Sequence, residues 1–91
     1  MKHAALALLM AASAAQADVV AIIQRDDLRL ELHNTEGPCQ HGARYALLVH
    51  GKTRTSGCWV LMIGRQEVAI AWLDGDWSAV PISLFKEPEK L

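Results

Sequence analysis

The sequence has little net charge, few cysteines and no long hydrophobic run, and each of these shortages excludes a class of protein. The formal net charge is −1 at pH 7, too weak and too evenly scattered to predict a nucleic-acid or anionic-membrane partner. The apolar stretch at residues 4–15 holds 12 apolar or small residues, fewer than the ~20 that a membrane-spanning helix needs. No internal repeat or low-complexity tract follows residue 17. We therefore expect neither a nucleic-acid-binding nor a membrane-spanning mature protein.

The short apolar stretch has the form of a secretory signal peptide. A basic start at Lys2 precedes it, and the small-x-small triplet at residues 15–17 follows it, which is the order typical of a signal peptide and its cleavage site. We expect a signal-peptide helix over residues 1–17, cleavage after Ala17 and a soluble exported chain that begins at Asp18. Removal of 17 of the 91 residues leaves 74.

The two cysteines of the chain, Cys39 and Cys58, are predicted to form a disulfide. In an exported chain a cysteine pair is best interpreted as a covalent cross-link. A core in a domain of fewer than ~80 residues contributes only about 3–5 kcal/mol net, so such a cross-link is needed. Closing this 20-residue loop contributes on the order of 3 kcal/mol in the chain-entropy account.

Residues 18–85 are predicted to form a single all-β domain, a small antiparallel sheet or partly open barrel of about five to seven short strands. Hydrophobic residues alternate at period two, as in residues 28–33, where Leu28, Leu30 and Leu32 face the core. The expected strands cover residues 19–24, 28–33, 43–50, 53–63 with an interruption at 56–57, 67–73, and a last strand that ends before Pro81. Residues 34–42 are predicted to form a loop, residues 82–85 a cap over the sheet and residues 86–91 a flexible tail.

The last hairpin is predicted to have a tight turn at Asp74-Gly75. This pair favours a two-residue type I′ turn, because both central residues need positive φ. Such a turn would pair Trp72 with Trp77 across the two strands.

The preceding hairpin turns at Gly64-Arg65. A two-residue turn there would pair Trp59 with Ile70, whereas a three-residue turn would move Trp59 to the opposite face. We expect the first register. Together the two hairpins would then place one set of apolar side chains on a single face of the sheet: Trp59, Leu61, Val68, Ile70, Trp72 and Trp77.

Possible catalytic motifs lack essential residues. Cys58-Trp59 is similar to the surroundings of a papain-type nucleophile, but Thr55 stands where that motif has a cysteine, and no histidine follows Cys58 to act as the base. Asp26-Asp27 and the acidic residues of the tail could suggest a glycosidase, yet 74 residues can hardly form both a core and a substrate cleft. We expect no catalytic residue and keep a small hydrolase only as a second alternative.

Possible metal motifs fail on spacing. Enough nitrogen and sulfur ligands for zinc are present: His33, Cys39, His41, His50 and Cys58. Their spacing matches no known zinc pattern, and an oxidising compartment would consume the thiolates. The segment 74–76 lacks the longer ligand series of a calcium loop. We expect no metal and no cofactor.

The three tryptophans, Trp59, Trp72 and Trp77, are the first candidates for a binding surface, although core packing is the commoner role of such side chains. An exposed aromatic patch would indicate recognition of a protein or a glycan. Pairing at the edge of the sheet is the other route by which so small a sheet could bind a partner.

Much of the mature chain resembles a group of short exported proteins of Gram-negative proteobacteria and their prophages. The segments that carry this resemblance are Cys39, Gly42-Ala43-Arg44, Gly51-Lys52, Gly57-Cys58-Trp59, residues 68–72, Asp74-Gly75-Asp76, Pro81 and Phe85. The resemblance implies a periplasmic location and assigns no activity.

The segment His41-Gly42-Ala43-Arg44-Tyr45 resembles the inhibitory loop, Ser-Gly-x-x-Tyr, of the periplasmic and membrane-bound inhibitors of C-type lysozyme, which are small β-barrels. The glycine and the tyrosine match, and His41 stands where that loop has its serine. The resemblance implies that Gly42, Arg44, Tyr45 and Lys52 are binding residues.

We therefore expect a non-enzymatic binding or envelope-interaction protein of the periplasm, whose partner is an envelope protein or a glycan. The candidate binding residues are Trp59, Trp72, Trp77, Arg44 and Tyr45. The alternative is a periplasmic protein like the C-type lysozyme inhibitors.

Overall fold

The computed structural model describes residues 18–88. The predicted signal-peptide helix, residues 1–17, lies outside the described residues. Within the described range no helix has the length and apolar character needed to span a membrane.

The structure is a single antiparallel sheet of six strands, in agreement with the predicted all-β fold. The strands are β1 (Val19–Arg25), β2 (Leu28–His33), β3 (Arg44–His50), β4 (Thr53–Met62), β5 (Glu67–Trp72) and β6 (Trp77–Pro81), and each pairs with its neighbours in sequence. Two short 3₁₀ turns, η1 (Ile63–Arg65) and η2 (Ile82–Leu84), follow β4 and β6. The predicted interruption at residues 56–57 was wrong, because β4 runs unbroken through Gly57.

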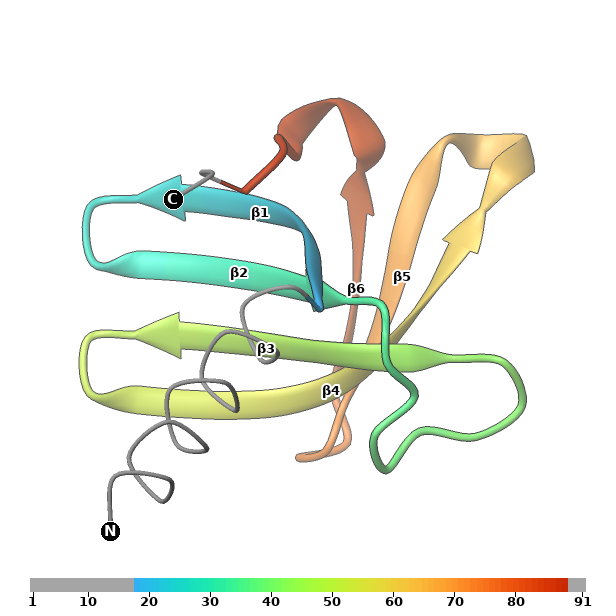
Figure 1. The fold of residues 1–91 in the computed structure, drawn as a ribbon, viewed down its shortest axis with the longest axis horizontal. Coiled ribbons are helices and arrows are strands. Elements are labelled where there is room, and N and C mark those ends of the chain that lie inside the picture. The colour runs from blue at the N-terminus through green and yellow to red at the C-terminus, as the bar shows by residue number, and fades with distance from the viewer. Residues whose placement is uncertain (1–17, 89–91) are drawn as a thin grey trace, which may run out of the picture.

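The sheet curls into a half-barrel, with β1 to β4 in front and β5 and β6 behind them (Figure 1). Beyond η2 the chain returns to the first strand, where Ile22 and Lys86 exchange two backbone hydrogen bonds of 2.9 Å. The segment predicted as a tail from residue 86 therefore begins with a residue that is paired to β1.

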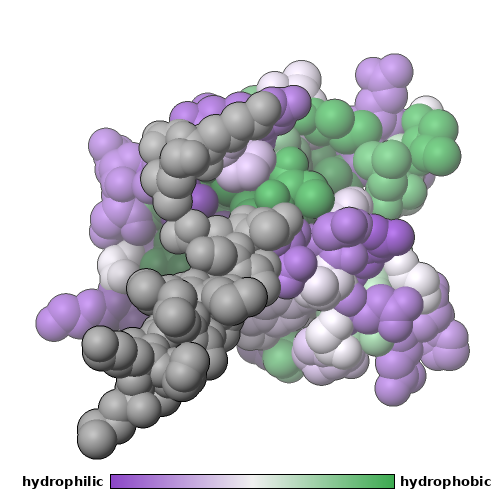
Figure 2. Space-filling view, in the orientation of Figure 1, coloured by the Kyte–Doolittle hydropathy of each residue, from purple (hydrophilic) through white to green (hydrophobic). Residues whose placement is uncertain are grey.

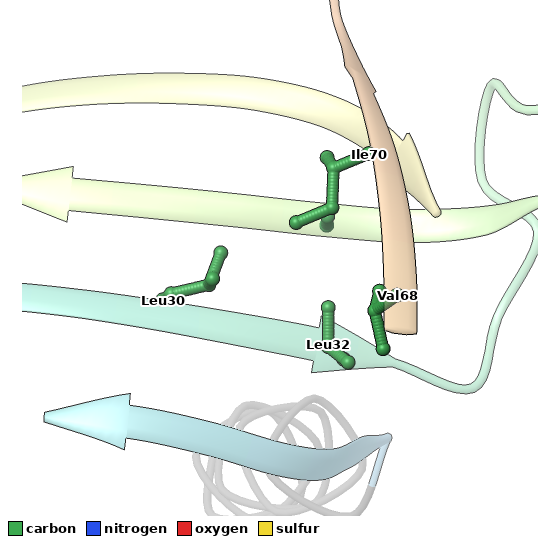
Figure 3. Packing of buried hydrophobic residues seen from close by; sticks show 5 residues of the cluster. Leu30, Leu32, Val68 and Ile70 are labelled. Carbon is green, nitrogen blue, oxygen red and sulfur yellow. The ribbon is translucent and has the colours of Figure 1, made fainter. Parts of the chain in front are cut away.

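The core lies on the inner face of the curl. Its buried side chains are Leu30, Leu32, Ala46, Val68 and Ile70. Figure 3 shows Leu30 and Leu32 of β2 gathered with Val68 and Ile70 of β5, two strands that are not neighbours in the sheet. Burying a leucine, isoleucine or valine side chain contributes about 1.5–3 kcal/mol, so the curl is stabilised by contacts between opposite parts of one sheet. The predicted inward direction of Leu30 and Leu32 is confirmed.

The β4–β5 hairpin has the predicted register, with Trp59 opposite Ile70. The connection is longer than expected: η1 and Gln66 lie between Met62 and Glu67, which are the last paired residues. Gln66 closes the turn in the left-handed conformation, with φ of 54°. The loop holds two residues more than the predicted two-residue turn, one from each strand, so the register of the remaining pairs is unchanged. The faces of β4 and β5 are preserved, since only an odd change in register inverts a strand.

The β5–β6 hairpin differs from the prediction by one residue. Trp77 pairs with Ala71 instead of Trp72. The Trp72 N–H donates to the Asp76 carbonyl at 2.8 Å, and the Gly75 N–H donates to the Trp72 carbonyl at 3.0 Å, so the loop holds residues 73–75. Gly75 has φ of 101°, as expected for the left-handed residue that ends a three-residue loop. The shift places Trp77 on the outer face, so the predicted Trp72–Trp77 contact was wrong.

Candidate functional site

The predicted disulfide between Cys39 and Cys58 is present, with an S–S distance of 2.07 Å. It attaches the loop between β2 and β3 to the middle of β4. Cys39 is buried, and its sulfur lies 3.7 Å from the carbonyl oxygen of Gly57. The loop is also held at its ends, because the Tyr45 N–H donates to the Thr35 carbonyl at 2.8 Å. The bond therefore fixes the least regular part of the chain against a central strand.

Two of the three candidate tryptophans, Trp59 and Trp72, belong to the inner face. Both are half-buried and pack against the core cluster. The Trp59 indole donates to the backbone carbonyl of His33 at 2.9 Å, and the Trp72 indole donates to Ser78 Oγ at 3.0 Å. Each indole thus has a polar partner, as buried tryptophans usually do. Their role in the structure is packing of the curl.

Gly57 makes room for one of these indoles. A Cβ atom at this position would lie 2.7 Å from Trp72 Cε3 and 2.8 Å from the Ala71 carbonyl oxygen. The two residues face each other across β4 and β5. The glycine inside a long strand is therefore explained by close approach of the Trp72 ring.

Trp77 is the candidate that reaches solvent, with 70% of its surface exposed. It lies on the outer face of the sheet in a group of apolar residues from the last three strands, which we call the outer apolar strip: Cys58 and Val60 of β4, Ala69 and Ala71 of β5, and Trp77 and Ala79 of β6. A shallow depression of about 200 Å³ lies on this strip, lined by Ala43, Cys58, Val60, Ala69, Ile70, Ala71 and Trp77. The walls are almost wholly apolar, and the disulfide residue Cys58 is one of them.

A second exposed apolar region lies at the β4–β5 connection. Ile63 at the start of η1 is 80% exposed and Leu61 is 50% exposed. In Figure 2 the hydrophobic colour gathers around this end of the described surface, whereas hydrophilic side chains predominate elsewhere on the visible face. Ile63 lies on a turn outside the strip, so its exposed aliphatic side chain provides a control for the exposed side chains of the strip.

Polar side chains form a network on the outer face of β2. Glu31 lies between Arg29 Nε at 2.7 Å and His33 Nε2 at 2.9 Å. Partial burial of the carboxyl acts to raise the pKa of Glu31, but the hydrogen bonds and charges of Arg29 and His33 outweigh it, so the pKa lies below its ordinary value. The group is thus held as a carboxylate by its two neighbours.

Tyr45 and Arg44 are engaged in local contacts at the start of β3. The Tyr45 and Ser56 hydroxyls share a hydrogen bond of 2.9 Å, and the Tyr45 ring meets His33 edge-on with centroids 5.1 Å apart. The Arg44 guanidinium donates to Asn34, while its side chain remains exposed. Gly42 is exposed in the preceding loop, with φ of 82°. The inhibitor hypothesis built on this segment stays a prediction.

The potential zinc ligands are dispersed by the fold. Cys39 and Cys58 are consumed by the disulfide, and His50 lies 3.5 Å from Asp27 in the β1–β2 and β3–β4 turn region. Within residues 18–88 no three histidine, cysteine, aspartate or glutamate side chains cluster as a metal ion would require.

The outer apolar strip was not predicted from the sequence. Its residues alternate with core residues at period two along β4, β5 and β6, so the pattern itself was visible. Trp77 was assigned to the opposite face because the length of the β5–β6 loop was mistaken by one residue. Comparison of the chain with models of known protein families, with curated proteins and with solved structures finds no match.

Proposed function

We propose that this chain is an exported, non-enzymatic binding protein that holds an envelope protein through its outer apolar strip, with Trp77 as the anchor. The observation that carries the proposal is the exposure of 70% of the Trp77 surface on a regular strand. An indole has 150–250 Å² available for burial and a single polar atom, so a partner that covers it gains a large contact area. Tryptophan is also among the residues that most often dominate the affinity of an interface.

The side chains around Trp77 favour a flat apolar partner. Ala69, Ala71 and Ala79 are small, and Val60 is the other large side chain of the strip, with 42% of its surface exposed. Because the six residues of the strip carry no charge, a partner with an apolar contact surface loses no ion hydration on binding. The shallow depression beside Cys58 would accept an aliphatic or aromatic side chain of that partner.

The disulfide supports both the proposed cellular compartment of the protein and the rigidity of its outer apolar strip. A cystine is typical of an oxidising compartment such as the periplasm, which agrees with the predicted signal peptide. Cys58 belongs to the strip and is tied to the loop through Cys39. Rigid contact residues lose less conformational entropy on binding, so the disulfide keeps the outer face in a binding conformation.

The test compares two exposed apolar side chains at different places on the sheet. Purified disulfide-bonded protein is used to capture partners from a periplasmic extract, and the affinity of the captured protein is measured with Trp77→Ala and with Ile63→Ala. Trp77→Ala should weaken binding about tenfold or more. Ile63→Ala, which removes the more exposed side chain outside the strip, should leave binding unchanged.

A photo-reactive residue at position 71 locates the contact directly, because Ala71 is exposed beside Trp77. It should cross-link to the captured protein, and the cross-link should disappear in the Trp77→Ala background. Equal losses of affinity with Trp77→Ala and with Ile63→Ala would exclude the outer apolar strip as the binding surface. Retention of peptidoglycan in place of a protein would overturn the proposed partner class.

A further inference from the structure

β6 is the last strand of the sheet, and its outer edge has no neighbouring strand (Figure 1). In the part of the chain that the structure describes, β6 pairs with β5 alone. The other edge strand, β1, is joined to Lys86 beyond η2. The edge of β1 is therefore covered at its middle by Lys86, whereas no described residue pairs with the outer edge of β6.

The hydrogen bonds at the two ends of the hairpin show which groups point to the open side. The Trp72 N–H donates to the Asp76 carbonyl, and the Ile82 N–H donates to the Gln66 carbonyl at 3.0 Å. In an antiparallel ladder the bonded pairs alternate with pairs whose N–H and C=O groups face outward. Ser78 and Val80 therefore bond to β5, whereas the backbone groups of Trp77 and Ala79 point away from the sheet.

The sequence of β6 lacks the usual protection of an open edge. Natural proteins block such edges with charged side chains, proline or bulges. β6 reads Trp-Ser-Ala-Val-Pro, with no charge, and Pro81 limits pairing only at its end. The exposed Ala79 and Trp77 leave the edge accessible to another strand.

We propose that β6 pairs antiparallel with β6 of a second copy of this chain about a two-fold axis that passes midway between the two Ser78 residues. In this register Trp77 of each copy lies opposite Ala79 of the other, and each pair exchanges both of its N–H···O=C bonds. The uncharged strand brings no like charges together across the axis. The large indole lies beside a small methyl group on the outer face, so the two side chains fit without collision.

A second copy of β6 supplies a strand that fits this register. Only Trp77 and Ala79 offer both an outward donor and an outward acceptor, because Pro81 has no N–H and the Gly75 N–H is used within the loop. A self-pairing strand centred on Ser78 satisfies all four of these groups in each copy. Two outer apolar strips then lie side by side in one continuous sheet, whether or not they bind an envelope partner.

The test measures the association of the purified disulfide-bonded protein by sedimentation equilibrium up to about 1 mM, since short edge contacts are weak. Ala79→Pro removes an N–H that points away from β5, so the hairpin is retained while the intermolecular pair is lost. Ala79→Glu places a carboxylate against the indole of the other copy. Both variants should raise the dissociation constant of the dimer about tenfold or more, with unchanged circular dichroism.

Val60→Glu is the matched control, because it adds the same charge to the outer apolar strip on β4, away from the β6 edge. Val60→Glu should change the dissociation constant of the dimer less than about threefold. It should abolish capture of the envelope protein. A wild-type protein that stays monomeric at about 1 mM, or a dimer weakened as much by Val60→Glu as by Ala79→Pro, would overturn edge pairing. Failure of partner capture with an intact, Ala79-dependent dimer would count against the proposed function alone.

Discussion

Replacement of Gly57 by alanine tests how tightly the inner face of the sheet is packed. The new Cβ atom would lie 2.7 Å from Trp72 Cε3, 2.8 Å from the Ala71 carbonyl oxygen and 3.2 Å from Ile70 Cγ2. One of these neighbours is backbone in a central strand, and the ring is held by its hydrogen bond to Ser78. The added methyl group must therefore push apart β4 and β5 or displace the indole.

The expected destabilisation follows from two opposing effects. Overpacking of a well-filled core costs about 1–3 kcal/mol. Replacing glycine by alanine lowers the entropy of the unfolded chain and offsets about 0.4–1 kcal/mol of this cost. A net loss of about 1–2 kcal/mol should lower Tm by about 4–16 °C for a domain of this size.

Thermal and urea unfolding of the oxidised protein measure this loss. Gly64→Ala is the matched control, because a Cβ atom at Gly64 meets no atom within 4 Å, and it should leave Tm unchanged or slightly higher. The double variant Gly57→Ala/Trp72→Ala should be less destabilised than the sum of the two single changes, since Trp72→Ala removes the colliding ring. A Gly57→Ala protein as stable as the wild type would refute the close-approach argument.

Three further predictions concern the disulfide, the Glu31 network and the Gly42–Tyr45 segment. Cys39→Ser/Cys58→Ser should lose on the order of 3 kcal/mol of stability in urea unfolding, and two free thiols in the exported wild-type protein by mass spectrometry would contradict the disulfide. The folded-state pKa of Glu31 lies below its ordinary value of 4.5. The Glu31 carboxylate therefore stabilises the folded protein above pH 4.5, and this stabilisation is lost as pH falls through the folded-state pKa. Glu31→Gln should therefore flatten the acid side of the stability profile, and an unchanged acid profile would exclude this linkage. The resemblance at residues 41–45 predicts inhibition of C-type lysozyme that weakens with Tyr45→Ala, and lysozyme activity unaffected by micromolar protein would end that hypothesis.

The elements predicted from the sequence were those that depend on strict alternation or on composition. Leu30 and Leu32 alternate with polar residues, so the core face of β2 was evident without a structure. The disulfide was predicted from two cysteines that follow a predicted export signal, and it is present. The pairing of Trp59 with Ile70 was also predicted, although the turn is longer, because an even change in loop length preserves the face.

Two features depend on information that local sequence does not contain. Asp74-Gly75 suits both a two-residue and a three-residue hairpin, because each needs a glycine with positive φ. The choice between them decides whether Trp77 faces the core or solvent, so the candidate site could not be assigned from that turn alone. Gly57 was interpreted as a strand breaker, whereas its reason is the ring of Trp72, a residue from another strand.

The pairing of Ile22 with Lys86 bears on the order in which the parts of the domain can fold. Each of the five strand ladders joins neighbours in sequence, and such local pairing can begin before the later strands are in place. Among residues 18–88, the Ile22–Lys86 bridge joins the two extremes of the domain, so it must wait for nearly the whole domain to emerge. β1 therefore stays without this partner until most of the domain is available, and the closure of the half-barrel comes late in folding.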